Sequence, residues 1–103
     1  MVSLQKWTSL RVMTIRRKID ILIEALNLTS GDRNNSYGPA TQDFTRIAVM
    51  WTALFGHYFT PKDVAMAMIC LKLSRESWMG KRDNWTDIAG YARLGNMCRE
   101  VGE

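Results

Sequence analysis

The sequence predicts an all-α protein: a small bundle of about four helices, completed by oligomerisation. Two observations support this prediction. Apolar residues recur every three or four positions along residues 9–27 and 40–55, as they do on one face of a helix. The pattern Thr60-Pro61-x-Asp63 is typical of a helix start, because each residue suits its position in the first turn.

Length and composition predict one domain over residues 1–103. Hydrophobic residues make up 47% of the chain, enough for a folded core, although a chain of this length has room for only a modest one. Seven Met and four Trp suit a chain that also buries surface between subunits, so we expect a homo-oligomer. The net charge of +4 and the pI near 9.4 favour an anionic partner such as a nucleotide.

Both cysteines lie in helical patterns. Cys70 and Cys98 have no second metal-ligand pair near them, so we expect buried, reduced thiols and a cytoplasmic protein. No apolar run has the length of a membrane span, and the N-terminus lacks a signal-peptide pattern. The sequence therefore predicts no membrane partner.

Residues 1–8 read as a short lead-in, and a first helix is predicted over residues 9–27. Its apolar stripe consists of Val12, Ile15, Ile19, Leu22 and Leu26. Arg16, Arg17, Lys18, Asp20 and Glu24 are expected on its solvated outer side.

Residues 29–40 are predicted to form the only long loop, because Ser, Gly, Asp, Asn and Pro dominate them. Tyr37 is the exception in this polar segment. Its ring either packs onto the core or stacks on a ligand beside Arg33.

A second helix is predicted over residues 40–55, ended by Gly56, and a third follows Thr60. Residues 64–71 of the third helix are apolar on all sides, which predicts that this helix is central and covered by neighbours or by another subunit. It would carry Lys72 and Arg75 outward from the core, where buried charges need partners.

The partners are expected across a hairpin that turns near Gly80. Asp83 and Asp87 share one face of a fourth helix, and an antiparallel hairpin brings them level with Arg75 and Lys72. Two interpretations stay open. The four charges form ion pairs that join the helices, or the cations clamp a phosphate while an aromatic ring such as Trp85 stacks on a base.

The sequence gives little support for catalysis. Asp20 with Glu24 and Asp83 with Asp87 have the spacing of carboxylates that hold Mg²⁺ in all-α hydrolases of nucleoside triphosphates, but no Glu-x-x-Glu appears. His57 has no acid or nucleophile close in sequence. We therefore expect no catalytic residue, no metal site and no cofactor.

DNA binding by a helix-turn-helix is also disfavoured. Residues 44–75 contain two predicted helices around Gly56, but the helix that would read the bases is the apolar segment 64–71. Such a helix needs polar side chains at the base edges, so we expect no DNA binding.

One stretch of the sequence resembles a known family. The pattern comprises Tyr37-Gly38, Phe44, Trp51, Thr60-Pro61-x-Asp63-Val64-Ala65, Lys72-x-x-Arg75 and Asp83-Asn84-Trp85-x-Asp87-Ile88-Ala89-Gly90-Tyr91-Ala92. It looks like a family of small phage and prophage proteins classed as a domain of unknown function. It is also similar to nucleotide-modification-associated phage domains and, more loosely, to MazG-like all-α nucleotide pyrophosphohydrolases.

The resemblance implies a phage origin, a helical fold and dealings with nucleotides. Because the first acidic motif of the MazG pattern is missing, we favour a nucleotide-binding protein of the host cytoplasm that sequesters a nucleotide signal of host defence without cleaving it. MazG-like, Mg²⁺-dependent pyrophosphohydrolysis is the alternative. The candidate ligand-binding residues are Arg33, Tyr37, Lys72, Arg75, Asp83, Trp85 and Asp87.

Overall fold

The computed structural model describes residues 19–99, and every regular element in that part of the chain is an α-helix. The helices are α2 (Ile21–Leu28), α3 (Asp32–Tyr37), α4 (Ala40–Phe55), α5 (Pro61–Trp78) and α6 (Arg82–Cys98). The predicted all-α class is therefore confirmed. The lead-in, the basic patch at residues 16–18 and the predicted helix before residue 19 lie outside the described residues.

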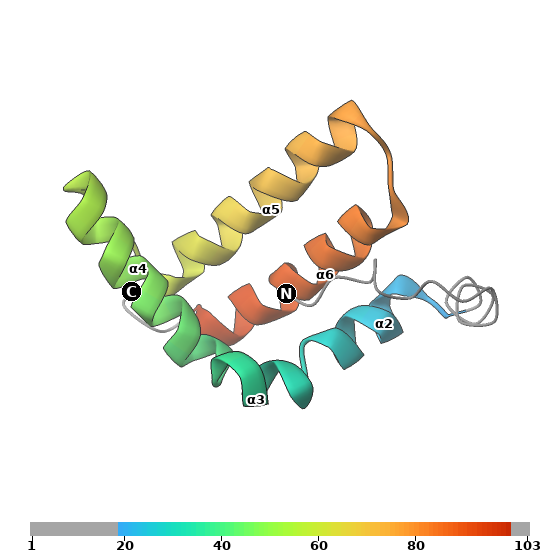
Figure 1. Cartoon of the computed structure of the whole chain (residues 1–103), viewed down its shortest axis with the longest axis horizontal. Coiled ribbons are helices and arrows are strands. Elements are labelled where there is room, and N and C mark those ends of the chain that lie inside the picture. Colours follow the sequence, from blue (N-terminus) through green and yellow to red (C-terminus); the bar gives the residue numbers. More distant parts are fainter. Residues whose placement is uncertain (1–18, 100–103) are drawn as a thin grey trace.

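Helix α6 is the centre of the fold. It lies between α5 and α2 and contacts α4 near its C-terminal end (Figure 1). Within the described chain α6 and not α5 is the central helix, although α5 is the more apolar of the two. The alternative that another subunit covers α5 stays a prediction. The polar side chains of α6 find partners on α5 and α2, so this helix can be buried despite its composition.

The hydrophobic core gathers where α4, α5 and α6 meet. Its members are Ala40, Phe44, Ala48, Val64, Ala65, Tyr91, Leu94 and Cys98. Gly95 explains how closely α5 and α6 approach, because a Cβ at this position would lie 3.0 Å from Cβ of Ala65. The core is small, and several large apolar side chains remain exposed around it.

The ends of α4 and α5 follow from their capping residues. Gly56 takes the left-handed conformation that glycine tolerates best, and its N–H donates to the Thr52 carbonyl at 3.0 Å. Thr60 and Asp63 form the predicted capping box: the Thr60 side chain accepts from the Asp63 N–H, and the Asp63 side chain accepts from the Thr60 N–H.

Helix α2 begins within the predicted helix of residues 9–27 and turns a different face inward from the predicted one. Asp20 is extended and caps the helix by accepting from the Leu22 N–H at 2.8 Å, so the helix starts at Ile21. Leu22 and Leu26, expected in the apolar stripe, are exposed, whereas Glu24 is buried against α6. The reason is electrostatic: the Glu24 carboxylate pairs with Arg82, and this pair turns the acidic side of α2 inward.

Residues 29–40 are not one continuous loop. Six of them form α3, which begins after Gly31 and ends at Gly38, both with positive φ. Composition alone concealed this helix, because Asn, Ser and Asp favour turns as readily as short helices. Arg33 of α3 donates to Asp43 of α4, and the Tyr37 carbonyl at the end of α3 accepts from Arg46 of α4.

The hairpin turn at Gly80 is confirmed, with α5 ending at Trp78 and α6 beginning at Arg82. The expectation for Cys70 is wrong, because this thiol is exposed on α5, while Cys98 is buried as expected. In the part of the chain that the structure describes, no helix is long and apolar enough to cross a membrane.

Candidate functional site

Arg33 is the most deeply buried charged residue of the candidate site. Its side chain is 2% exposed, and Nη2 donates to Oδ2 of Asp43 at 2.8 Å. The guanidinium carbon lies 5.5 Å from the ring centre of Tyr37 and 5.3 Å from that of Phe44. We call Arg33, Tyr37, Asp43, Phe44 and Tyr91 the Arg33 cluster.

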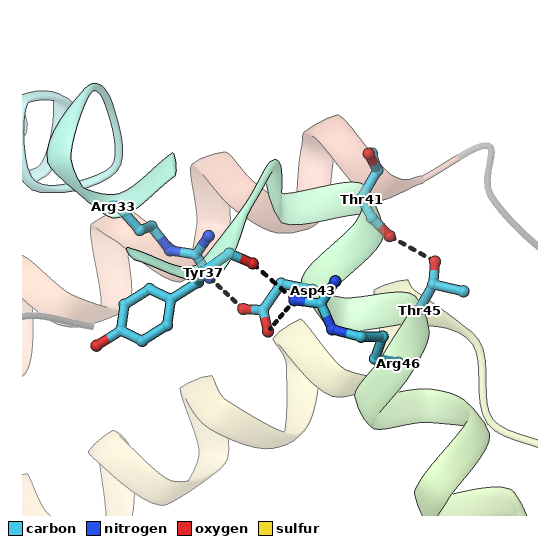
Figure 2. A network of polar contacts seen from close by, with 6 residues as sticks. All are labelled: Arg33, Tyr37, Thr41, Asp43, Thr45 and Arg46. Carbon is cyan, nitrogen blue, oxygen red and sulfur yellow. Dashed lines mark hydrogen bonds and ion pairs between the residues drawn. The ribbon is translucent and has the colours of Figure 1, made fainter. Parts of the chain in front are cut away.

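The neighbouring Arg46 closes the outer side of this cluster (Figure 2). It lies 3.6 Å from Oδ1 of Asp43, and its Nη2 donates to the Tyr37 carbonyl at 2.6 Å. Since Arg46 is exposed, its ion pair with Asp43 contributes little to the stability of the fold on its own. It does hold the C-terminal end of α3 against α4.

Two donors of the buried Arg33 remain open. Among the described residues, neither Nε nor Nη1 has a hydrogen-bond partner. A buried polar group without a partner is rare in folded proteins, because leaving one costs about 1–3 kcal/mol. The open donors therefore mark Arg33 as a place where a ligand acceptor, or a water molecule, would be bound favourably.

Tyr91 links the Arg33 cluster to the helical hairpin. Its ring centre lies 6.4 Å from that of Phe44, and it follows Asp87 by one turn of α6. Burial, followed by the negative charge of Asp87, raises the pKa of Tyr91 above its usual value, while Arg33 opposes the shift. The phenol thus lies within the electrostatic reach of both an anion and a cation.

The expected ion pair between Lys72 and Asp87 is present. Nζ of Lys72 lies 2.8 Å from Oδ2 of Asp87, with the two side chains 16% and 12% exposed. For the second expected pair, Arg75 is exposed and Asp83 is half-buried, and the contact between them stays a prediction. Of the seven candidates, the structure groups Arg33, Tyr37, Lys72 and Asp87 around Tyr91, and it places Arg75, Asp83 and Trp85 nearer the hairpin turn.

Glu76 organises the turn end of the hairpin. Its carboxylate accepts from Nδ2 of Asn84 at 3.0 Å, from the Lys81 N–H at 2.9 Å and from Nε1 of Trp85 at 3.0 Å. The hydrogen bond from Asn84, followed by that from Lys81, holds the pKa of Glu76 below its ordinary value of 4.5. Trp85 is therefore fixed beside α5 by its own hydrogen bond, and its half-exposed ring remains open to solvent.

This geometry predicts how stability depends on pH. A carboxyl whose pKa is lowered by folding stabilises the fold above its unfolded pKa, and this contribution is lost as the pH falls through the folded value. We therefore expect Glu76→Gln to melt below the parent protein at pH 7, and the gap to narrow below pH 4.5. Thermal melts from pH 7 to pH 3 measure it.

Asp20→Asn is a matched control, since asparagine also caps helices and the parent residue is exposed. Its melting temperature should stay near that of the parent at pH 7. A difference in melting temperature between Glu76→Gln and the parent that stays constant down to pH 3 would contradict the lowered pKa of Glu76.

Three of the four carboxylates that the alternative prediction assigned to a metal have other partners. Asp20 caps α2, Glu24 pairs with Arg82, and Asp87 pairs with Lys72. Among residues 19–99, no group of three or more His, Cys, Asp or Glu side chains is arranged to hold a metal ion. These three carboxylates therefore act in capping a helix and in joining one helix to another.

Sequence reasoning missed Asp43, Glu76 and Tyr91. Tyr91 had a usable pattern, since it lies four residues after Asp87 and so shares its helical face. Asp43 and Glu76 had none, because their partners Arg33 and Asn84 are defined by tertiary contacts.

Comparison with known proteins identifies relatives of this chain. The curated relatives include the Gene 55 protein of Mycobacterium phage L5, 43% identical over 76 residues, which cover 72% of this chain and 49% of that protein. The Gene 55 protein of Mycobacterium phage D29 is 40% identical over 73 residues, which cover 70% and 48%. The chain thus spans about half the length of the curated relatives it matches. No solved structure matches it.

These relatives support a phage origin. The resemblance to a phage domain of unknown function is confirmed at the level of the family, whereas the MazG relation remains a prediction. Residues 20–99 match the family described as "Domain of unknown function (DUF6378)", and this match covers nearly all of the described chain. The chain belongs to the DUF6378 family.

Proposed function

We propose that this chain is a phage protein that binds a nucleotide at the Arg33 cluster without cleaving it. The observation that carries the proposal is the buried guanidinium of Arg33, held between two aromatic rings with two donors open. A phosphate oxygen or the edge of a base would accept from such donors, and charge-assisted hydrogen bonds of this kind are the strong ones.

Tyr37 supplies the second part of the recognition. Its ring is 40% exposed and lies beside Arg33, so one face is available to stack on a base. Lys72 contributes positive charge, but its pairing with Asp87 lowers the local net charge. This mixture favours a small nucleotide held by stacking and a few hydrogen bonds over a long polyanion.

Binding without cleavage is favoured over hydrolysis because Asp87, Glu24 and Asp20 are engaged by cations and by a helix end. A phage origin suggests what such binding achieves. A protein that holds a nucleotide signal of host defence lowers its free concentration, and it needs no catalytic group to do so.

The test is calorimetry with a panel of mononucleotides, cyclic nucleotides and dinucleotides, with and without a chelator, followed by chromatography of the recovered ligand. We expect binding that survives chelation, weakens as salt rises and returns the ligand intact. Release of pyrophosphate and a monophosphate would instead establish the MazG-like alternative. A panel with no binder at millimolar concentration would reject the proposal.

Tyr37→Ala locates the site. Loss of stacking is expected to weaken binding by about 1–3 kcal/mol, which is roughly a 5- to 150-fold rise in Kd. Tyr58→Ala is the matched control, because this tyrosine is also exposed but lies in the turn between α4 and α5. Equal losses for both variants would place the ligand elsewhere.

A further inference from the structure

Helix α5 leaves an uncharged face uncovered. We define the α5 outer face as Met66, Ala67, Cys70, Leu71, Leu73, Ser74, Ser77 and Trp78, all of which are exposed. Lys72 and Glu76 of this stretch have partners on α6 or the hairpin turn, and the exposed Arg75 borders the face on the side of Leu71 and Trp78. An uncharged helix face in water is unusual for a soluble domain and marks an interaction surface.

Small residues recur on this face at helical spacing and form a line along its centre. Ala67, Cys70, Ser74 and Ser77 are separated by three, four and three residues, which is the spacing of a seam between two packed helices. The large side chains flank this seam, with Leu71 and Trp78 on one side and Met66 and Leu73 on the other. The seam therefore admits a close neighbour whose contacts are sealed by large residues on both flanks.

We propose that the α5 outer face packs antiparallel against the same face of a second copy of this chain. A two-fold axis near position 72 sets Cys70 opposite Ser74 and Ala67 opposite Ser77 of the second copy. It also sets Leu71 beside Leu71 on one flank and Leu73 beside Leu73 on the other. One operator thus matches small residues with small and large with large, as an isologous interface requires.

Trp78, Met66 and Leu73 supply much of the apolar area of the α5 outer face. A stable interface buries about 800 Å² on each partner, so the contact must extend beyond these side chains to the rest of the face. Trp78 is 90% exposed, and a single aromatic side chain buries about 150–250 Å². Met66 and Leu73, each about half exposed, extend the strip along the helix.

The second copy fits better than residues 1–18 of the same chain. Arg82 donates to the carbonyl of Ile19, which holds the start of the described chain beside α6. From there α2 continues along one side of α6, whereas α5 lies along the other (Figure 1). On α2, next to the start of the described chain, Leu22, Ile23 and Leu26 form a separate exposed apolar surface.

Engineered cross-linking tests the register in the full-length chain. The substitution Ser74→Cys introduces a thiol that the two-fold axis sets opposite the native Cys70 of the second copy, so each dimer gains two such pairs. Mild oxidation should therefore convert the variant to a linked dimer of twice 11.8 kDa on a non-reducing gel. Asn96→Cys, at an exposed position of α6, is the control and should add no cross-link beyond that of the parent. Equal cross-linking of both variants overturns the proposed register.

Light scattering tests the assembly itself. The parent should have twice the chain mass at micromolar concentration, and Cys70→Arg should be a monomer with parental helix content, because it sets two like charges near the axis. Leu54→Arg, at an exposed apolar position of α4, should remain a dimer. A dimer that Cys70→Arg leaves intact overturns the proposal.

A monomeric parent also overturns it, and the Cys70→Arg melt then identifies the occupant. A lower melting temperature in a monomer would indicate that residues 1–18 cover the face, and an unchanged one would leave the face to a different partner. Loss of nucleotide binding with the dimer retained would count against the proposed function alone, so the two proposals fail separately.

Discussion

Asp43→Ala is expected to lower the free energy of unfolding by about 3–5 kcal/mol, the largest effect of any single substitution considered. The carboxylate of Asp43 is the hydrogen-bonding partner of a guanidinium that is 2% exposed. Without it, Arg33 would keep its charge in a site walled by Tyr37 and Phe44, with Nη2 joining two donors that already lack partners. A domain of this size has a net stability of about 5–15 kcal/mol, so this loss would be a large share of it.

Urea denaturation measures this loss, and two variants show that it arises from the buried cation. Asp43→Asn keeps an acceptor oxygen and should lose less than Asp43→Ala. The double variant Arg33→Met with Asp43→Leu removes both charges and should recover most of the loss, since an apolar pair of similar volume replaces a buried ion pair at little cost. Arg46→Ala is the exposed control, and we expect a change of about 0–1 kcal/mol.

Elements set by local chemistry could be predicted from the sequence. The bounds of α4 follow from its apolar spacing and from Gly56, and the start of α5 follows from the reciprocal bonds of Thr60 and Asp63. The Lys72–Asp87 pair could be predicted because a hairpin about Gly80 fixes which turns of α5 and α6 lie level.

Features set by competition between helices could not be predicted. The rotation of α2 depends on Arg82, which is 58 residues away from Glu24 and draws it inward. Apolar content suggested that α5 is central, but burial depends on whether polar groups find partners and how closely backbones approach. Helix α6 meets both conditions, through Glu76 and Lys72 on α5 and through Gly95 at the contact with Ala65.

The candidate site could be predicted only in part, because its geometry also depends on contacts between helices. Arg33 and Tyr37 were expected in a loop, with the Tyr37 ring either packed onto the core or stacked on a ligand beside Arg33. The short helix α3 instead turns Arg33 onto Asp43 and leaves Tyr37 beside it at the surface. The sequence therefore indicated which residues belong to the site. Their burial could not be predicted, because it depends on how the helices pack.

Asp87→Ala is the second large effect, and we expect a loss of about 3 kcal/mol, the lower end of the range for a broken buried pair. Lys72 is 16% exposed and has a flexible stem, so its ammonium can move toward water when the carboxylate is removed. Urea denaturation of Asp87→Ala, Lys72→Met and the double variant gives the coupling energy directly. A coupling energy near zero would show that the pair contributes nothing to the stability of the hairpin.

Replacing Asp87 also has a spectroscopic consequence. Burial raises the pKa of Tyr91 most, and the negative charge of Asp87 is the next largest cause, ahead of Asp43. Removing its negative charge stabilises the phenolate, so the pKa of Tyr91 should fall in Asp87→Asn, a variant that preserves shape. Tyrosinate absorbance against pH measures the shift, and Tyr91→Phe identifies which of the three tyrosines is responsible.

A folded parent holds the Tyr91 proton more tightly than the unfolded chain does, so the parent should lose stability as the pH rises above about 10. That alkaline loss should be smaller in Asp87→Asn, since the charge that opposes ionisation is gone. A Tyr91 titration that does not respond to Asp87→Asn would mean that Asp87 and Tyr91 do not share one electrostatic environment, and the link between the hairpin and the Arg33 cluster would then be lost.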